Sequence, residues 1–473
     1  MSHFPVLHQH LVIVGNGMAA HRLVESLRKL PGAPSRITVI GEEHSAAYNR
    51  IMLSPWLAGE IDHSGLLLPS AAADQPEKLH AAPHIETRLG LRVTTIDRAG
   101  HHLHCANGEV IDYDHLVIAT GSRSFMPELA GLELEGVGGF RDLQDAENLA
   151  SNTIKGGAAV VIGGGLLGLE AAEGLRKRGM QVTVLQRSDR LMNRQLDTTA
   201  ARMLTQELGS RGLHIITAAN PTEIIGNDQG QVCGVRLAGK NGIIAADQVV
   251  IAAGITPNIE LGLDAGLDCQ HAILVDEYLA TSDPDISALG ECCQFQDSTY
   301  GLVDPIWRQV DVLAKRLCAQ PGEPYRDQES ATKLKISGIS LYAFGPTDAE
   351  PHHEVLTYHD PQQGEYRRLL LRAGRLEGAV LYGDTRMGPW LFQLAQDATQ
   401  LDSVRQSLLL GQADTEALFS EHLTQYQSSE PHAESAGSAH ASASCSDAKS
   451  SDPKNVDFKS VDSKNSAAAQ EAA

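Results

Sequence analysis

Four short runs of apolar residues, each ending in glycine, are the clearest pattern along this chain. They are LVIVG (residues 11–15), LVIATG (116–121), AVVIGGG (159–165) and QVVIAAG (248–254). Runs this short and continuous are typical of parallel strands that are buried on both faces of a sheet. Between them, residues 19–30 and 167–179 repeat apolar positions at helical spacing, which predicts helices that cover the sheets. The pattern predicts an α/β fold with doubly wound, Rossmann-like sheets.

The pattern changes from about residue 331, where apolar and polar positions alternate. Residues 334–345 and 367–383 predict strands and turns, and residues 390–398 predict a helix. We expect a small α+β domain there. From about residue 428 the chain is rich in Ser and Ala and repeats Asp-x-Lys every five residues. That period fits neither helix nor strand and little is apolar, so we expect a disordered tail, either a solvated linker or a tether for a partner.

Composition limits the classes of function. The 473 residues include 38 Lys and Arg against 59 Asp and Glu, a net charge of −21. A surface for nucleic acid or an anionic membrane would need clustered positive charge, so we expect neither partner. No apolar run is long enough for a spanning helix, and the N-terminus lacks the features of a signal peptide. The seven cysteines are scattered without a C-x-x-C, which favours a reducing cytoplasm over a disulfide framework or a cysteine-ligated metal.

The first apolar run leads into a glycine pattern, Gly15-x-Gly17-x-x-Ala20, and then a predicted helix. The first glycine makes a tight turn, the second lets a pyrophosphate approach the backbone, and the small third residue lets helix and strand pack. The next strand (36–43) ends in acid, and we take Glu42 as the residue that binds the ribose hydroxyls, with the helix N-terminus facing the phosphates. This stretch predicts a dinucleotide site; the alternative is a tight turn without a ligand.

The same construction recurs at Gly163-x-Gly165-x-x-Gly168. Where its ribose acid is expected, the sequence offers Gln186 and Arg187. A carboxylate there would repel a 2′-phosphate, whereas arginine would accept one, so the sequence leans toward NADPH or toward use of both nucleotides. The alternative for Arg187 is a solvated loop charge. Two dinucleotide sites in one chain imply two dinucleotides that react together, and the usual pair is a nicotinamide and a flavin.

Taken together, these residues resemble the two-dinucleotide flavoprotein disulfide reductase superfamily over about residues 10–325. Further motifs of that superfamily are YDHLVIATGS (113–122), VVIAAGITPN (249–258) and TSDPDISALGE (281–291). The resemblance implies that Glu291 binds a ribityl hydroxyl of FAD. It also assigns cofactor contacts to Ala119, Thr120, Gly121 and Gly254.

Two adjacent cysteines, Cys292 and Cys293, follow Glu291. A disulfide between adjacent residues closes a strained ring, and no other cysteine is spaced to share a metal, so we expect structural cysteines and keep a redox role as the alternative. The disulfide-reducing members of the superfamily place their reactive cysteine pair in the segment that corresponds to residues 46–60. That segment contains no cysteine, so thiol–disulfide chemistry is disfavoured.

The Y-x-R-x-x-L-S motif at residues 48–54 instead resembles the ferredoxin and rubredoxin reductases and the flavin module of the large NAD(P)H nitrite reductase subunit. In the ferredoxin reductases a lysine near the flavin follows this serine, and Pro55 stands in its place here. The resemblance places Glu170 near the nicotinamide, with a helix-surface carboxylate as the alternative, and Trp307 by the isoalloxazine edge. We take Arg50, Glu170 and Trp307 as candidate catalytic residues, and Arg50 also as a cofactor ligand.

A more specific resemblance is to that nitrite reductase module and to the electron-transfer subunit of assimilatory nitrate reductase, over about residues 10–412. The matching stretches are VIVGNGMAAHR (12–22), SDRLMNRQLD (188–197), TYGLVDPIWRQ (299–309), LKISGISLYAFG (334–345) and residues 383–412. The nitrite reductase continues into a sirohaem and iron–sulfur domain. This sequence holds no corresponding cysteine set, so we expect no metal and no nitrite reduction by this chain alone.

The resemblance and the composition together imply four regions. They are a discontinuous FAD-binding domain (1–122 and 250–325), an NAD(P)H-binding domain (123–249), a C-terminal α+β interface domain (330–415) and the disordered tail (428–473). We expect electrons to pass from NADH or NADPH through FAD to a separate protein, either a nitrate or nitrite reductase or a ferredoxin-like carrier; a homodimer stays open. The alternatives are a ferredoxin or rubredoxin reductase of another pathway and a flavin-bound, NAD(P)H-responsive sensor or scaffold.

Overall fold

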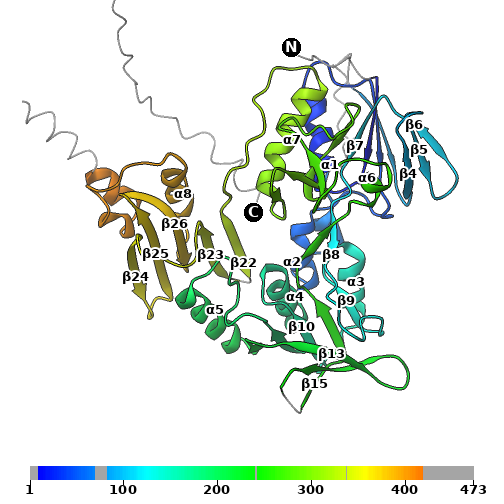
Figure 1. Cartoon of the computed structure of the whole chain (residues 1–473). Coiled ribbons are helices and arrows are strands. Elements are labelled where there is room, and N and C mark those ends of the chain that lie inside the picture. The colour runs from blue at the N-terminus through cyan, green and yellow to red at the C-terminus, as the bar shows by residue number, and fades with distance from the viewer. Residues whose placement is uncertain (1–8, 70–82, 240–241, 337, 419–473) are drawn as a thin grey trace, which may run out of the picture. The chain divides into compact units, whose positions relative to one another are not determined.

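The computed structural model describes residues 9–69, 83–239, 242–336 and 338–418 (Figure 1). The predicted disordered tail, with its Asp-x-Lys repeats and Cys445, lies outside the described residues. None of the helices in the described ranges is long and apolar enough to cross a membrane.

The first sheet is parallel and has the strand order β19-β7-β1-β2-β3. Its strands are β1 (His10–Val14), β2 (Arg36–Ile40), β3 (His84–Arg88), β7 (His115–Ile118) and β19 (Ile286–Ala288). All four positions of β7 and all three of β19 are buried, and so are four of the five in β1. The predicted strands of continuous apolar character are therefore confirmed, because a strand covered on both faces needs apolar side chains at every position.

Helices α1 (Met18–Lys29) and α7 (Val303–Leu317) lie together on one side of this sheet (Figure 1). The antiparallel strands β4 (Val93–Asp97), β5 (His102–Cys105) and β6 (Val110–Asp112) contribute to the same hydrophobic core. Smaller elements complete the region: β8 (Ser122–Ser124), β17 (Ile255–Pro257), α6 (Glu260–Asp264), β18 (Ile273–Val275), β20 (Cys293–Phe295) and β21 (Ser298–Thr299). Helix α2 (Leu53–Leu57) also follows β2 in the chain, but its buried leucines pack into the core of the second sheet's helices.

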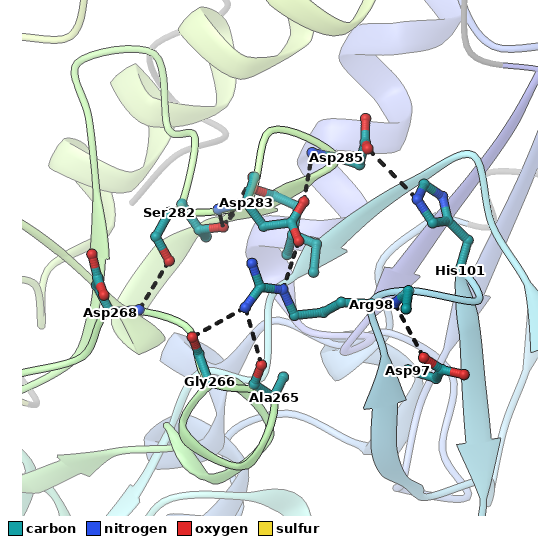
Figure 2. A network of polar contacts seen from close by, with 12 residues as sticks. Asp97, Arg98, His101, Ala265, Gly266, Asp268, Ser282, Asp283 and Asp285 are labelled. Atoms are coloured by element: carbon teal, nitrogen blue, oxygen red, sulfur yellow. Dashed lines mark hydrogen bonds and ion pairs between the residues drawn. The ribbon is translucent and has the colours of Figure 1, made fainter.

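A polar network fixes the turn that precedes β19 (Figure 2). Arg98, just after β4, donates from Nε to the Asp283 carboxylate at 2.6 Å and from Nη1 to the backbone oxygens of Ala265 and Gly266. His101 lies 3.6 Å from Asp285 on the same turn. The turn is thus tied to the β4–β5 hairpin and to the end of α6. Since β19 leads directly to Glu291, this network helps to position a predicted site residue.

The second sheet repeats the parallel scheme in the order β12-β11-β10-β16-β9. Its strands are β9 (Val137–Gly139), β10 (Ala158–Ile162), β11 (Gln181–Leu185), β12 (His214–Ile216) and β16 (Gln248–Ile251). They are accompanied by α3 (Leu143–Ser151), α4 (Leu166–Lys177), α5 (Thr198–Ser210) and the antiparallel strands β13 (Pro221–Gly226), β14 (Val232–Leu237) and β15 (Ile243–Ala245). Strand β16 runs across the predicted boundary at residues 249/250; the domain boundaries stay a prediction.

The third region is an antiparallel sheet in the order β22-β23-β26-β25-β24. Its strands are β22 (Thr332–Ile336), β23 (Ile339–Phe344), β24 (Glu354–Asp360), β25 (Glu365–Arg372) and β26 (Arg375–Tyr382), followed by α8 (Gly388–Gln396). One set of its side chains forms a core of its own with α8, and another packs into the core around α4 and α5. There the Tyr366 hydroxyl donates to the buried Asp197 carboxylate at 2.7 Å. The predicted α+β fold of this part of the chain is confirmed.

Candidate functional site

The first glycine loop (residues 15–20) joins β1 to α1. Gly15 has a φ of 118°, and a Cβ on it would lie 2.1 Å from the backbone oxygen of Ala119 at the end of β7. Only glycine fits this close crossing. Gly17 is the N-cap of α1, has no side-chain cap and faces open space, while Ala20 is fully buried. The structure brings Gly15, Gly17, Ala20 and Ala119 together at an uncovered helix N-terminus, which fits a phosphate.

The acid end of the first site contains two neighbouring glutamates that differ in environment. The side chain of Glu42 is 70% exposed and lies 3.7 Å from Arg92. Glu43, for which the sequence motifs predict no role, accepts hydrogen bonds from the Tyr48 hydroxyl at 2.7 Å and from Arg50 at 2.9 Å. Glu42 therefore stays free to meet a ribose, and its role stays a prediction. Glu43 instead orients the predicted site residue Arg50.

Glu291 follows β19 and is only 14% exposed. It accepts a hydrogen bond from Ser122 Oγ at 2.8 Å and pairs with the guanidinium of Arg141, whose backbone oxygen accepts from Arg50 at 3.2 Å. The Nε of Arg141 is buried and has no hydrogen-bond partner among the described residues. An unsatisfied buried donor beside a carboxylate suits a ligand that carries both hydroxyl and phosphate oxygens. FAD carries both. Sequence motifs gave no signal for Arg141, since it stands alone before α3.

The remaining predicted residues of the first site surround the same strand ends. Thr120 Oγ1 donates to the backbone oxygen of Asn258 at 2.9 Å, and Gly121 has a φ of 66°. The backbone oxygen of Gly254 accepts from Phe125 at 2.9 Å, which connects the paired strands β8 and β17. Trp307, half-buried on α7, has the Arg22 guanidinium 5.6 Å from its ring centroid. Contacts of these residues with a flavin stay predictions.

The second glycine loop (residues 163–168) joins β10 to α4 in the same way. Gly163 has a φ of 125°, and a Cβ on it would lie 2.2 Å from the backbone oxygen of Ala252. A Cβ on Gly168 would lie 2.0 Å from the backbone oxygen of Gly163, so α4 packs tightly against its own loop. Gly165 is the uncapped N-cap of α4 and faces open space. The loop leaves room for a second pyrophosphate at this helix N-terminus.

At the end of β11, Gln186 turns toward the second glycine loop. Its Oε1 accepts from the Gly164 backbone N–H at 2.8 Å, and its Nε2 lies 3.3 Å from Asn193 Oδ1 and beside Ser188 Oγ. Arg187 is exposed. The structure thus separates the two predicted residues: one supports the loop, and the other projects into solvent.

Glu170 on α4 meets Ser54 on α2, which links the two glycine-loop regions. Ser54 Oγ donates to Glu170 Oε2 at 2.6 Å. Burial raises the pKa of Glu170 from its ordinary value of 4.5 to about 7. Pro55, which follows Ser54, brings no positive charge to this contact. Glu170 can therefore hold or release a proton near neutral pH.

Cys292 and Cys293 are both fully buried. Their thiols face backbone oxygens, Cys292 Sγ lying 3.4 Å from that of Ile118 and Cys293 Sγ 3.2 Å from that of Gly290. Burial raises the pKa of both thiols, and thiolate is the reactive form. These contacts favour the prediction that the two cysteines have a structural role.

Two further features lie away from the glycine loops. An open cavity of about 830 Å³ lies beside β18 and β20, and none of the predicted site residues lines it. Among the described residues, Glu350, His352 and His353 could group around a metal ion. Both ring nitrogens of His353 are already bonded, to the Glu350 backbone N–H and to Glu377, and Arg372 pairs with both glutamates. This group is better explained as an ion-pair network than as a cation site.

Comparison with known proteins gives consistent matches. Residues 9–312 match the family model of pyridine nucleotide-disulphide oxidoreductases, and residues 331–399 match the rubredoxin NAD+ reductase C-terminal domain. The chain is 35% identical over 410 residues to nitrite reductase (NAD(P)H) of Bacillus subtilis (strain 168), covering 86% of this chain and 50% of that protein. It is 37% identical over 379 residues to the assimilatory nitrate reductase electron transfer subunit of the same organism, covering 80% and 48%.

Among solved structures, the covalent putidaredoxin reductase–putidaredoxin complex has a TM-score of 0.75 at 25% identity, over 87% of this chain and 98% of that chain. The chain spans about half the length of the two Bacillus subtilis relatives. These matches confirm the predicted relationship to two-dinucleotide reductases, the predicted fold class and the predicted cofactors, FAD and NAD(P)H.

Proposed function

Because this chain belongs to the pyridine nucleotide-disulphide oxidoreductase family, we propose that it takes reducing equivalents from NAD(P)H through FAD and delivers them to a separate redox protein of nitrate or nitrite assimilation. The observation that carries this proposal is the pair of glycine loops, each with a glycine crossing a neighbouring backbone oxygen and each ending at an uncapped helix N-terminus. One chain with two such sites can hold a donor and an acceptor dinucleotide together.

The residues present fit FAD at the first site. Bound FAD would accept a hydride and release electrons singly or in pairs. Gly15 and Gly17 would leave space for its pyrophosphate at the start of α1. Arg141 Nε is a buried donor without a partner among the described residues, and with the Glu291 carboxylate beside it this pair would offer FAD both a donor and an acceptor.

Glu170 is the protein group best placed to handle a proton where the two regions meet. Its hydrogen bond with Ser54 fixes the carboxyl on α4 against α2, and its pKa of about 7 allows both protonation states at neutral pH. Bound FAD would supply redox chemistry that exchanges protons as well as electrons, and Glu170 could hold or release one of those protons near neutral pH.

The acceptor is proposed from the relatives. Two Bacillus subtilis relatives are named as nitrite reductase and as an electron transfer subunit of assimilatory nitrate reductase, so a partner of that pathway is the first choice. A second candidate is a small carrier protein, as for a ferredoxin or rubredoxin reductase. It is favoured by the match at residues 331–399 and by the likeness to the putidaredoxin reductase complex, which spans nearly all of that reductase.

The test is an anaerobic absorbance titration of the purified full chain with NADH and with NADPH, followed by nitrate reductase, or by a ferredoxin or rubredoxin. We expect a flavin spectrum that one equivalent of nucleotide bleaches and that a protein acceptor restores. Gly163→Ala is the matched control, because it should keep the flavin spectrum while losing the response to nucleotide.

The outcomes separate the candidates. Rapid reoxidation by nitrate reductase supports the assimilatory role, and rapid reoxidation by the small carrier alone supports the second candidate. A chain that binds no flavin, or whose flavin neither nucleotide bleaches, would show that the two sites do not work together and would overturn both.

A further inference from the structure

The end of β11 decides which nucleotide the second site accepts, and three features there bear on it. Residues 186–188 contain no carboxylate, so the group that usually binds both ribose hydroxyls of NADH is missing. Gln186 is a weaker substitute, because its amide oxygen already accepts a hydrogen bond from the Gly164 N–H at 2.8 Å and the amide carries no negative charge. The amide end of Gln186 points toward Ser188 and Asn193. Gln186 therefore braces the glycine loop and leaves the ribose without its usual anchor.

The arginines after β11 are not equivalent. Arg190 is only 18% exposed, and its guanidinium is held by the Leu196 backbone oxygen at 3.1 Å and by Asp348 at 2.8 Å. The one other nearby carboxylate that it contacts, Asp189, lies 3.7 Å away. Arg190 thus neutralises both acids and fastens this loop to the third region. Within the part of the chain that the structure describes, the Arg190 guanidinium is thus held by the backbone of its own loop and by the third region.

Arg187 is the exception. It is exposed, directly follows Gln186, and has no hydrogen bond or ion pair with any of the residues that the structure describes. A guanidinium left uncompensated next to the ribose position suits a phosphate dianion, which it can meet with two parallel hydrogen bonds. Arg194 is also exposed, but it stands seven residues further on, past the Asn193 contact of Gln186.

We propose that the second site selects NADPH over NADH, with Arg187 binding the 2′-phosphate and Gln186 holding the glycine loop in place of a ribose contact. This inference rests on the proposed function and specifies its electron donor. NADPH would gain the attraction of Arg187 for its 2′-phosphate, and NADH would lack a carboxylate for its ribose hydroxyls. The selectivity would therefore arise at the adenosine ribose, and both nucleotides would bind the nicotinamide half of the site in the same way.

The test separates binding from turnover. Calorimetry with adenosine 2′,5′-bisphosphate and with 5′-AMP measures how much the 2′-phosphate contributes to binding affinity, without any flavin chemistry. We expect the full-length FAD-loaded chain to bind the bisphosphate at least 10-fold more tightly, the size expected for a charge-assisted contact. Arg187→Ala should lower the ratio of the two affinities, bisphosphate over AMP, to near one. Raising the salt concentration to about 1 M should do the same, because the interaction of an exposed charge is screened.

Arg202→Ala is the matched control, since Arg202 is an exposed arginine on α5 in the same region. It should leave the ratio unchanged. Gln186→Glu should reduce binding of the bisphosphate more than that of AMP, because it restores a carboxylate beside the 2′ position. A wild-type ratio near one, or an unchanged ratio in Arg187→Ala, would overturn the inference even if both nucleotides bleach the flavin. A flavin that neither nucleotide bleaches, together with a high ratio, would overturn the proposed function and leave the inference standing.

Discussion

The two glycine loops follow one plan and differ in two places. In both, a glycine with positive φ crosses a backbone oxygen, that of Ala119 in the first loop and that of Ala252 in the second. At the third position the first loop accepts the methyl group of Ala20, whereas a methyl group on Gly168 would lie 2.0 Å from a backbone oxygen. The glycine that crosses a backbone oxygen is common to both loops, because any pyrophosphate needs that close approach to the backbone. The differences lie at the position that packs the helix against the strand and at the residue that would face the ribose.

The second difference concerns the residue after each second strand. The first site ends in two glutamates and the second in Gln186 and Arg187. A carboxylate accepts from ribose hydroxyls, whereas an arginine next to an amide favours an added phosphate. We therefore predict that the two loops share one way of binding a pyrophosphate but accept different dinucleotides.

The largest expected effect comes from adding a methyl group at either crossing. Gly15→Ala should reduce the FAD that copurifies to below about a tenth, since the new Cβ would collide with the Ala119 oxygen. Gly163→Ala should keep FAD and weaken NADPH binding by about 100-fold or more. Absorbance at the flavin band and calorimetric titration measure the two effects. Loss of flavin in Gly163→Ala would contradict the independence of the two loops.

A smaller effect is expected where the two regions meet, at Glu170. Its carboxyl has a raised pKa, so the folded protein binds the proton more tightly than the unfolded chain does. The corresponding stability is fully present below about pH 4.5 and is lost as the pH rises through about 7. Glu170→Gln keeps the acceptor for Ser54 and removes the titration. Relative to wild type, its free energy of unfolding should therefore rise by about 2–3 kcal/mol between pH 5 and pH 8.

Denaturant unfolding across this pH range measures the difference. Glu173→Gln is the control on the same helix, because the Glu173 carboxylate is paired with Arg176 at 2.7 Å and its loss should destabilise the protein at every pH in the range. A Glu170→Gln difference that does not change with pH would refute the buried proton.

The next effect concerns the contact between the second site and the third region. Tyr366→Phe removes a buried hydrogen bond to Asp197, the N-cap of α5, and should lower the free energy of unfolding by about 1–2 kcal/mol. NADPH affinity should change less than about threefold, because Tyr366 is not predicted to contact the nucleotide. The matched control is Tyr358→Phe, at a tyrosine that is 36% exposed and should lose little. Equal losses at both positions would count against the importance of the buried contact.

The smallest effect tests the third position of the first loop. Ala20→Gly should cost about 0.5–1 kcal/mol through backbone entropy in α1 and leave FAD bound. Ala19→Gly, at the half-buried neighbour, corrects for helix propensity alone. Thermal unfolding measured with and without added FAD gives both quantities. Loss of FAD in Ala20→Gly would mean that the methyl group of Ala20 itself shapes the first site, and the two loops would then be less alike than we describe.

Much of the fold could be predicted because strand burial and glycine loops leave local signals. The apolar runs gave β1, β7, β10 and β16 to within a few residues, and the alternating pattern gave the third region. The candidate site was harder. The choice of Glu42 ignored Glu43, since adjacent acids look alike in sequence and only their neighbours Tyr48 and Arg50 distinguish them. Arg141 had no motif because its partner Glu291 is 150 residues away.

The sequence by itself determined where phosphates can approach the backbone, because glycine spacing and an uncapped helix start act over a few consecutive residues. Only the tertiary structure decided which charges are satisfied. In the folded chain Ser54 donates a hydrogen bond to Glu170, which is 116 residues away, and Gln186 accepts one from the second glycine loop. Arg190 is paired with Asp348, whereas Arg187 is exposed. The physical reason is that an ionisable group takes its energy from whatever lies within a few ångströms, and in a folded chain those neighbours come from distant segments.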